Sequence, residues 1–329
     1  MMLNGKKVLV TGAGGFIGSH LAERLAELGA EVTAMVHYNA LGDTGNMRFV
    51  APDLRGGMKL AFGNVEDSDF MRSLIEGQEI IFHLAALIAI PYSYVAPRSY
   101  VRANIEGTLN VLEAGRQLGA ARIIHTSTSE VYGTAVRVPI DEEHPLQGQS
   151  PYSASKIGAD KLAESYYRSF QTPVVTVRPF NTFGPRQSAR AFIPTVISQA
   201  LSLEEVSLGS LDPERDMTFV SDTVEGFIAA AMAQGVEGET INLGTGTAHT
   251  IGYFAERIMQ IVGVEKSIKL DPARLRPQKS EVGRLVSDNS KASRLLGWQP
   301  KISVDEGLER AIEFVRQNLD LYRPQTYTV

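Results

Sequence analysis

Short apolar runs alternate with longer segments of helical spacing along the first half of the chain. Val8–Thr11 is an apolar run that ends in glycines, and Phe16–Leu28 then repeats apolar residues every three or four positions until Gly29. Strands separated by helices are joined by right-handed crossovers, so the pattern predicts an α/β fold with a doubly wound parallel sheet. The further predicted strands are Glu31–Val36, Glu79–Ala86, Arg122–Ser127 and Pro173–Arg178, and the further helices are Asn104–Leu118 and Tyr152–Phe170.

The pattern changes after Arg178, where loops lengthen and helices outnumber strands. One more strand, Glu239–Leu243, is expected to return to the sheet. We therefore predict a sheet domain at residues 1–178 and a smaller lobe of mixed α/β structure at 179–329, with 223–245 returning to the sheet domain. The predicted helices after Arg178 are Ile193–Leu201, Thr223–Ala233, Ile251–Val262 and Val304–Asn318.

Composition narrows the class of protein. Of the 329 residues, 43% are hydrophobic and 21% are charged, and a net charge of −5 without a lysine-rich stretch argues against a nucleic-acid partner. The absence of cysteine excludes disulfides, thiolate catalysis and cysteine-ligated zinc, and the six histidines lack metal-ligand spacing. No signal peptide is visible, and the longest apolar stretch, Ile80–Ile90, is shorter than the roughly 20 residues that span a bilayer. We expect a cytoplasmic protein with no metal and no membrane partner.

The first candidate site is a glycine-rich turn between a strand and a helix. It reads Gly12-Ala-Gly14-Gly15-Phe16-Ile17-Gly18. Residues without side chains let the backbone turn tightly and approach a pyrophosphate, which then rests on the helix N-terminus. The turn predicts a dinucleotide cofactor and a Rossmann-type sheet domain.

The segment that follows the second predicted strand differs from the usual dinucleotide pattern. An acidic residue normally lies there and accepts hydrogen bonds from the adenosine ribose. This chain has Met35-Val36-His37-Tyr38-Asn39 instead, without a carboxylate. His37 can contact a 2′-phosphate, stack on the adenine, or be an ordinary strand-end residue, so NAD is expected and NADP is not excluded.

A second candidate site is Tyr152-Ser-Ala-Ser-Lys156, on a predicted helix. Residues four apart share a helix face, so the phenol and the ammonium lie together, and a cation beside a phenol lowers its pKa. This gives a general base for the oxidation of an alcohol.

A third segment, Thr126 to Gly133, places Thr128 and Glu130 beyond a strand at the sheet edge where ligands bind in such folds.

Taken together, these segments resemble the extended short-chain dehydrogenases/reductases that modify nucleotide sugars. The resemblance covers nearly the whole chain. It includes, besides the segments above, His83-Leu-Ala85-Ala86, Asn104, Arg178-Pro-Phe-Asn181, Arg215-Asp216, Arg276-Pro277 and Leu296-Gly-Trp298. It implies that Asn64 faces the adenine and that Ala85 and Ala86 let the cofactor lie flat. The expected cofactor contacts are Gly12, Gly14, Gly15, Phe16, Ile17, Gly18, His37, Asn64, Val65, Leu84, Ala85, Ala86, Thr126, Tyr152 and Lys156.

The resemblance also implies how the reaction starts. Tyr152 takes the proton of the sugar 4-hydroxyl while C4 gives hydride to the nicotinamide, and the resulting ketone acidifies the C5 proton. The catalytic set is expected to be Tyr152, Lys156, Thr128, Ser129 and Glu130. Glu130 favours dehydration or decarboxylation over simple 4-epimerisation, but the Thr128-Ser129-Glu130 triplet resembles both GDP-mannose 4,6-dehydratases and UDP-glucuronate decarboxylases. Where dTDP-glucose 4,6-dehydratases have Thr-Asp-Glu, this chain has Ser129.

Three further segments favour dehydration. Leu208 to Asp216 resembles a loop of GDP-hexose dehydratases, and Ala89 to Tyr94 together with Arg276 to Glu281 resembles the N-acetylhexosamine 4,6-dehydratases of legionaminic acid-type pathways. We therefore predict a 4,6-dehydratase that acts on GDP- or UDP-N-acetylglucosamine. The alternatives are a 4-epimerase, a UDP-glucuronate decarboxylase, or a nucleotide-binding protein without turnover.

The remaining expectations concern substrate contacts and assembly. Guanidinium groups match phosphate oxygens, so Arg215 and Arg276 are expected to clamp the substrate diphosphate, with Asn181 as a further contact. Members of the resembling family commonly dimerise through two helices per subunit. A homodimer through Pro97–Leu118 and Tyr152–Phe170 is therefore expected.

Overall fold

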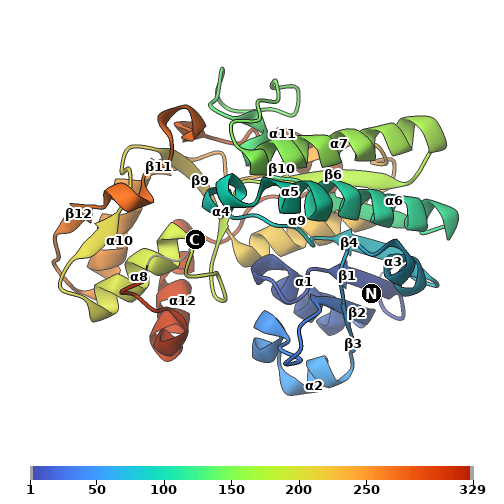
Figure 1. The fold of residues 1–329 in the computed structure, drawn as a ribbon, viewed down its shortest axis with the longest axis horizontal. Coiled ribbons are helices and arrows are strands. Elements are labelled where there is room, and N and C mark those ends of the chain that lie inside the picture. Colours follow the sequence, from blue (N-terminus) through green and yellow to red (C-terminus); the bar gives the residue numbers. More distant parts are fainter. Residues whose placement is uncertain (1–2, 327–329) are drawn as a thin grey trace.

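A seven-stranded parallel sheet forms the centre of the protein. The computed structural model describes residues 3–326 and is drawn in Figure 1. The strand order is β10-β6-β5-β4-β1-β2-β3, and every neighbouring pair runs parallel. The strands are β1 (Lys7–Thr11), β2 (Glu31–His37), β3 (Lys59–Gly63), β4 (Ile80–His83), β5 (Arg122–Thr126), β6 (Val174–Pro179) and β10 (Thr240–Leu243).

Helices cover both faces of this sheet (Figure 1). Alternate residues of β1 point to opposite faces, so Leu9 packs with one helix layer while Val8 and Val10 pack with the other. One layer contains α3 (Ser68–Ile75), α6 (Gly107–Gln117) and α7 (Pro151–Phe170), and the other contains α1 (Phe16–Glu27), α9 (Val220–Met232) and α11 (Ser290–Leu296). This is the predicted Rossmann-type, doubly wound architecture.

A smaller mixed lobe lies beside the carboxyl ends of the central strands. Its helices pack on the same continuous hydrophobic cluster as α1 and α9, which fixes the lobe against the sheet. Its helices are α8 (Phe192–Ser202), α10 (Ile251–Val262) and α12 (Val304–Gln317). Its strands are β7 (Asn181–Phe183), β8 (Val206–Leu208), β9 (Glu214–Phe219), β11 (Ala248–Thr250), β12 (Ile268–Leu270) and β13 (Arg284–Leu285), arranged as a small sheet around β9 and a β8–β12 pair.

Several elements differ from the sequence-based expectation. The strand expected at Glu79–Ala86 ends at His83, because the chain leaves the sheet there and Leu84 onward lines a cavity. The helix expected from Asn104 starts with a π-helical turn at Val101–Glu106. The apolar pattern did not reveal β3 and α3. The remaining short helices are α2 (Pro52–Gly56), α4 (Ile90–Val95) and α5 (Pro97–Tyr100).

Candidate active site

One large cavity runs along the carboxyl ends of the central strands and into the lobe. Its volume is about 1680 Å³. It opens where the strand order reverses between β1 and β4, the position at which doubly wound sheets bind ligands. All of the residues proposed from sequence as catalytic, cofactor-binding or substrate-binding line this cavity. The structure therefore brings the whole predicted set together, including segments that are far apart along the chain.

The glycine turn forms the floor of one end of the cavity. Gly12 has a φ of +72°, and a Cβ atom there would lie 2.8 Å from the backbone nitrogen of Ala85. A Cβ at Gly18 would run into the carbonyl group of Gly12. Only glycine permits this close approach of loop, helix and β4, and the open backbone at the N-terminus of α1 fits a pyrophosphate.

A loop after β2 closes the end of the cavity beside the glycine turn, where the sequence predicts the adenosine of the cofactor. The Asn39 side chain ties this loop together, because its Oδ1 accepts from the Asp43 backbone nitrogen at 2.8 Å and its Nδ2 donates to the Asp43 carbonyl at 2.8 Å. The Asn46 nitrogen donates to the Gly14 carbonyl at 2.9 Å, which pins the loop on the glycine turn. Asp43 thus lines the cavity together with His37. Sequence reasoning missed this carboxylate because it looked only at the end of the strand.

The N-terminus of α7 sets the positions of Tyr152 and Lys156, the candidate catalytic pair. Ser150 and Ser153 form a reciprocal capping box that fixes the first turn of the helix. Tyr152 and Lys156 then share one helix face, and their side chains are 7% and 4% exposed. The Lys156 ammonium donates to the Thr126 carbonyl at 2.6 Å, and the Tyr152 hydroxyl is paired with Thr128.

The electrostatics of this pair differ from the expectation. Burial raises the pKa of Tyr152, and the hydrogen bond with Thr128 opposes that shift, whereas the sequence predicted a lowered pKa from the nearby ammonium. Burial also lowers the pKa of Lys156 to about 8. The prediction of a lowered phenol pKa is therefore wrong, because the loss of solvation dominates and the charges of Glu130 and Asp160 raise the pKa further.

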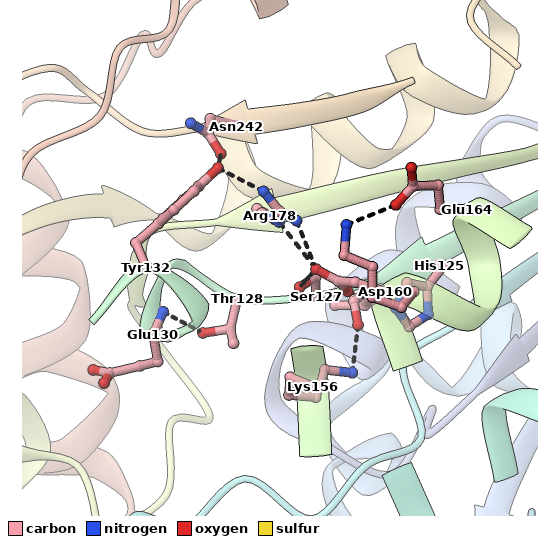
Figure 2. A network of polar contacts seen from close by, with 12 residues as sticks. His125, Ser127, Thr128, Glu130, Tyr132, Lys156, Asp160, Glu164, Arg178 and Asn242 are labelled. Carbon is pink, nitrogen blue, oxygen red and sulfur yellow. Dashed lines mark hydrogen bonds and ion pairs between the residues drawn. The ribbon is translucent and has the colours of Figure 1, made fainter. Parts of the chain in front are cut away.

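Glu130 stands in the cavity between this pair and the lobe. It lies in a short 3₁₀ helix, Ser129–Tyr132. Thr128 caps this helix, because its Oγ1 accepts a hydrogen bond from the Glu130 backbone nitrogen at 3.2 Å. Among the described residues its carboxylate has no ion pair within 4.0 Å, although its charge acts on both Tyr152 and Arg215. In Figure 2 the Glu130 carboxylate points away from the buried polar cluster. Ser129, by contrast, is buried.

Charged side chains form the lobe end of the cavity. Arg215 on β9 donates to the Glu281 carboxylate at 3.2 Å, and Arg276 lies 3.6 Å from the same carboxylate. Asn181 on β7 leaves its buried Oδ1 without a hydrogen-bond partner among the described residues. Arg215, Arg276 and Asn181 therefore place polar groups at this end of the cavity.

A buried polar cluster lies behind the catalytic helix (Figure 2). Asp160 on α7 accepts from His125 Nε2 at 3.0 Å and from Ser127 Oγ at 2.8 Å. Arg178 on β6 donates to the same carboxylate through Nε and Nη2 at 3.0 and 2.9 Å. Sequence reasoning missed Asp160, although its place one helical turn after Lys156 was a usable signal.

Comparison with known proteins decides the family. The sequence profile of the GDP-mannose 4,6-dehydratase family matches residues 9–311. The chain belongs to this family. The resemblance to extended short-chain dehydrogenases/reductases, drawn from the motifs, is thereby confirmed. Within residues 3–326 no helix is long and apolar enough to cross a membrane, and no cluster of side chains suited to a metal ion is found.

Relatives of this family member catalyse different reactions. A UDP-glucose 4-epimerase of Mycolicibacterium smegmatis is 31% identical over 94% of this chain and 98% of the relative. A dTDP-glucose 4,6-dehydratase of Actinoplanes sp. is 31% identical over 95% and 98% of the two chains. A UDP-glucuronic acid decarboxylase 1 of Xenopus tropicalis is 33% identical over 96% and 73%. Similarity alone therefore does not select one reaction.

A solved structure shows the same architecture with ligands. The UDP-glucuronic acid 4-epimerase from Bacillus cereus, in complex with UDP-glucuronic acid and NAD, superposes with a TM-score of 0.87 at 29% identity, over 95% of this chain and 99% of that one. The chain thus belongs to a superfamily of nucleotide-sugar dehydratases, epimerases and decarboxylases that share this fold.

Proposed function

We propose that the protein is an NAD-dependent 4,6-dehydratase of a nucleotide sugar, with GDP- or UDP-N-acetylglucosamine as the substrate. The observation that carries this proposal is the Glu130 carboxylate. Of the carboxylates that line the cavity, Glu281 is ion-paired with Arg215, and Asp43 and Glu66 follow β2 and β3 at the adenosine end. Glu130 is the carboxylate near Tyr152 that has no ion pair and is thus available for proton transfer.

The cavity fits NAD in shape and charge. The glycine turn and the N-terminus of α1 would hold the pyrophosphate, Ala85 and Ala86 the dinucleotide, and Asp43 the adenosine ribose. The cationic residues that line the cavity are Lys156, Arg190, Arg215, Arg274 and Arg276, all outside the β1–β3 segment. A 2′-phosphate would meet the Asp43 carboxylate instead of a cation, which supports NAD over NADP. Bound NAD supplies the hydride acceptor at C4 and the hydride donor at C6.

The chain's own residues move the protons. Tyr152 Oη takes the proton of the sugar 4-hydroxyl in its phenolate form, which is the minor form because burial raises the pKa of Tyr152, and the Lys156 ammonium stabilises that phenolate. Thr128 orients the Tyr152 hydroxyl through its hydrogen bond. Glu130 removes the C5 proton, which the 4-ketone has acidified, and then donates a proton to the departing 6-hydroxyl. When hydride returns to C6, Tyr152 gives the proton that it took from the 4-hydroxyl to C5. Both side chains are then restored, and the net change is the loss of one water.

Substrate binding is proposed to use the lobe end. Arg215 and Arg276 match a diphosphate in charge and donor geometry, and the unpaired Oδ1 of Asn181 fits a sugar hydroxyl donor.

The chain is also proposed to form a homodimer through Pro97–Leu118 and α7. Light scattering would report about twice the chain mass.

A second candidate is a 4-epimerase, which Ser129 favours. This buried residue replaces the aspartate of the Thr-Asp-Glu triplet, so the site offers no second carboxylate beside Glu130. A 4-epimerase would need only room for the 4-ketone to turn, which a cavity of about 1680 Å³ provides.

The product distinguishes these reactions. Purified protein with NAD is incubated separately with GDP- and UDP-N-acetylglucosamine, and with UDP-glucuronic acid as a third substrate. Mass spectrometry and proton NMR are expected to show a 4-keto-6-deoxy sugar that has lost one water. A C4 epimer of unchanged mass, or loss of carbon dioxide, would reject dehydration.

The Glu130→Gln variant tests the carboxylate directly. We expect the rate of water loss to fall by about 10²–10⁴-fold, the usual contribution of a positioned acid or base. The affinity for NAD should not change, because Glu130 lies away from the adenosine end. The matched control is Glu76→Gln, an exposed carboxylate outside the cavity, which should retain full activity. Full dehydration by Glu130→Gln would remove this residue from the mechanism.

A further inference from the structure

Asp160 and Lys156 lie one helical turn apart on the buried face of α7. Asp160 is 4% exposed, and both side chains approach the end of β5: Lys156 donates to the Thr126 carbonyl, and Asp160 accepts from Ser127 Oγ. No carboxylate of residues 3–326 forms an ion pair with Lys156 within 4.0 Å, and Asp160 is the carboxylate whose charge acts on it. Figure 2 shows Lys156 and Asp160 side by side along the helix.

The Asp160 charge is balanced from the other side. Arg178 makes two hydrogen bonds to Asp160 and a third to the Tyr132 hydroxyl at 2.9 Å. Tyr132 in turn donates to Asn242 Oδ1 on β10 at 2.8 Å. The carboxylate is therefore held between an ammonium on its own helix and a guanidinium on β6.

The imidazoles and the phenol around Lys156 are uncharged near neutral pH. His125 on β5 and His83 on β4 are fully buried, and burial lowers the pKa of both imidazoles. Tyr152 on α7 is a phenol whose pKa is raised by burial. Glu130, in the turn after β5, acts on Tyr152 from the cavity side. Asp160 and Arg178 are thus the charged pair on the protein side of Lys156.

We propose that the Asp160–Arg178 pair is a positioning device for the catalytic lysine: Asp160 holds Lys156 as an ammonium, and Arg178 limits how strongly it does so. The pair touches neither substrate nor cofactor and acts through Lys156. The effect on turnover rests on the proposed role of Lys156, whereas the effect on Lys156 itself does not depend on that role.

The sign of each effect follows from the charges. Hydrogen bonds and the charge of Arg178 hold the pKa of Asp160 at about 2 despite its burial, so it is an anion at any working pH. Burial lowers the pKa of Lys156, and the Asp160 anion opposes this shift. The net result is a pKa of about 8. Removing Asp160 should lower the pKa of Lys156 further. Removing Arg178 should raise it, because the remaining anion is no longer balanced.

Two single variants should therefore move the same titration in opposite directions. Lys156 is titrated in the cofactor-free protein by NMR of isotope-labelled lysine, and its signal is identified by its absence in Lys156→Met. We expect Asp160→Asn to shift the titration down by about one pH unit, a tenfold change in the proton equilibrium. We expect Arg178→Gln to shift it up by about half a unit. The alkaline limb of the kcat/KM profile should follow the same order.

Controls separate charge from structural damage. Ser127→Ala removes one hydrogen bond to Asp160 without changing any charge, so it should leave the titration in place. If a single variant does not fold, the double variant Asp160→Asn/Arg178→Gln avoids an unpaired buried charge. It should still shift the titration down, because Asp160, one helical turn from Lys156, is the charge that acts on it. The proposal would be overturned if both single variants shifted the titration in the same direction. It would also be overturned if neither single variant shifted it, or if the double variant did not. A shifted titration in a protein without dehydratase activity would instead reject only the proposed function.

Discussion

The two ends of the cavity are built in different ways. At the dinucleotide end, backbone atoms form most of the surface: the Gly12–Gly18 turn and the loop after β2, which the Asn46 nitrogen joins to the Gly14 carbonyl. At the lobe end, charged side chains from separate segments meet, with Arg215 and Arg276 around Glu281. The dinucleotide end is a rigid surface to which side chains contribute little. The second is a set of ion pairs whose partners a charged ligand can replace.

This difference matters for a family whose members share a cofactor but differ in reaction. A backbone-built site tolerates little substitution, because a single added carbon meets other backbone atoms. A side-chain-built site can change its charge pattern without changing the fold. We therefore expect substitutions at the two ends to have different effects. Those at the dinucleotide end should weaken cofactor binding and lower stability, and those at the lobe end should weaken substrate binding.

The largest effect is expected from Gly12→Ala. A non-glycine residue at positive φ costs about 1–3 kcal/mol, and the new Cβ would also press on the backbone of Ala85. Urea unfolding should show a lower free energy of unfolding, and calorimetric titration should show a much weaker affinity for NAD. Gly56→Ala is the control, because its Cβ would meet no atom within 4 Å. Unchanged NAD affinity in Gly12→Ala would contradict a backbone-built cofactor end.

A smaller and different effect is expected from Arg215→Lys. The substitution keeps the charge but removes the planar fork that matches phosphate oxygens, so KM for the nucleotide sugar should rise about tenfold while kcat changes little. Steady-state kinetics measures the split, and the dissociation constant of NAD should stay the same. Arg284→Lys is the matched control, since Arg284 lies on the neighbouring strand and pairs with Glu214 outside the cavity. A fall in kcat with unchanged KM would place Arg215 in the chemistry instead.

The smallest effect is expected from Asp43→Ala. The carboxylate repels a 2′-phosphate across a solvent-exposed gap, an interaction worth about 1 kcal/mol, so its loss should narrow the preference for NAD over NADP by about fivefold. Dissociation constants for both dinucleotides report the ratio, with the exposed Asp53→Ala on α2 as control. An unchanged ratio would mean that another group selects the cofactor.

The outcome of the sequence predictions follows the same division. The glycine turn, the Tyr152–Lys156 spacing and most strands could be predicted because each depends on a local pattern. The lowered phenol pKa could not be predicted correctly, because it depends on how deeply α7 is buried. β3 was missed because its Lys59-Leu-Ala-Phe-Gly63 pattern is short and only weakly alternating.

The sequence by itself determined the fold class, the glycine turn and the helix that carries Tyr152 and Lys156, because hydrophobic periodicity, glycine and residue spacing act over a few neighbours. Only the tertiary structure decided which charges meet. It placed Asp43 at the adenosine end, Glu281 between two arginines, and Arg178 behind Asp160, 18 positions away in the chain. Electrostatic interactions act through space, so they depend on the packing of distant segments that no local pattern records.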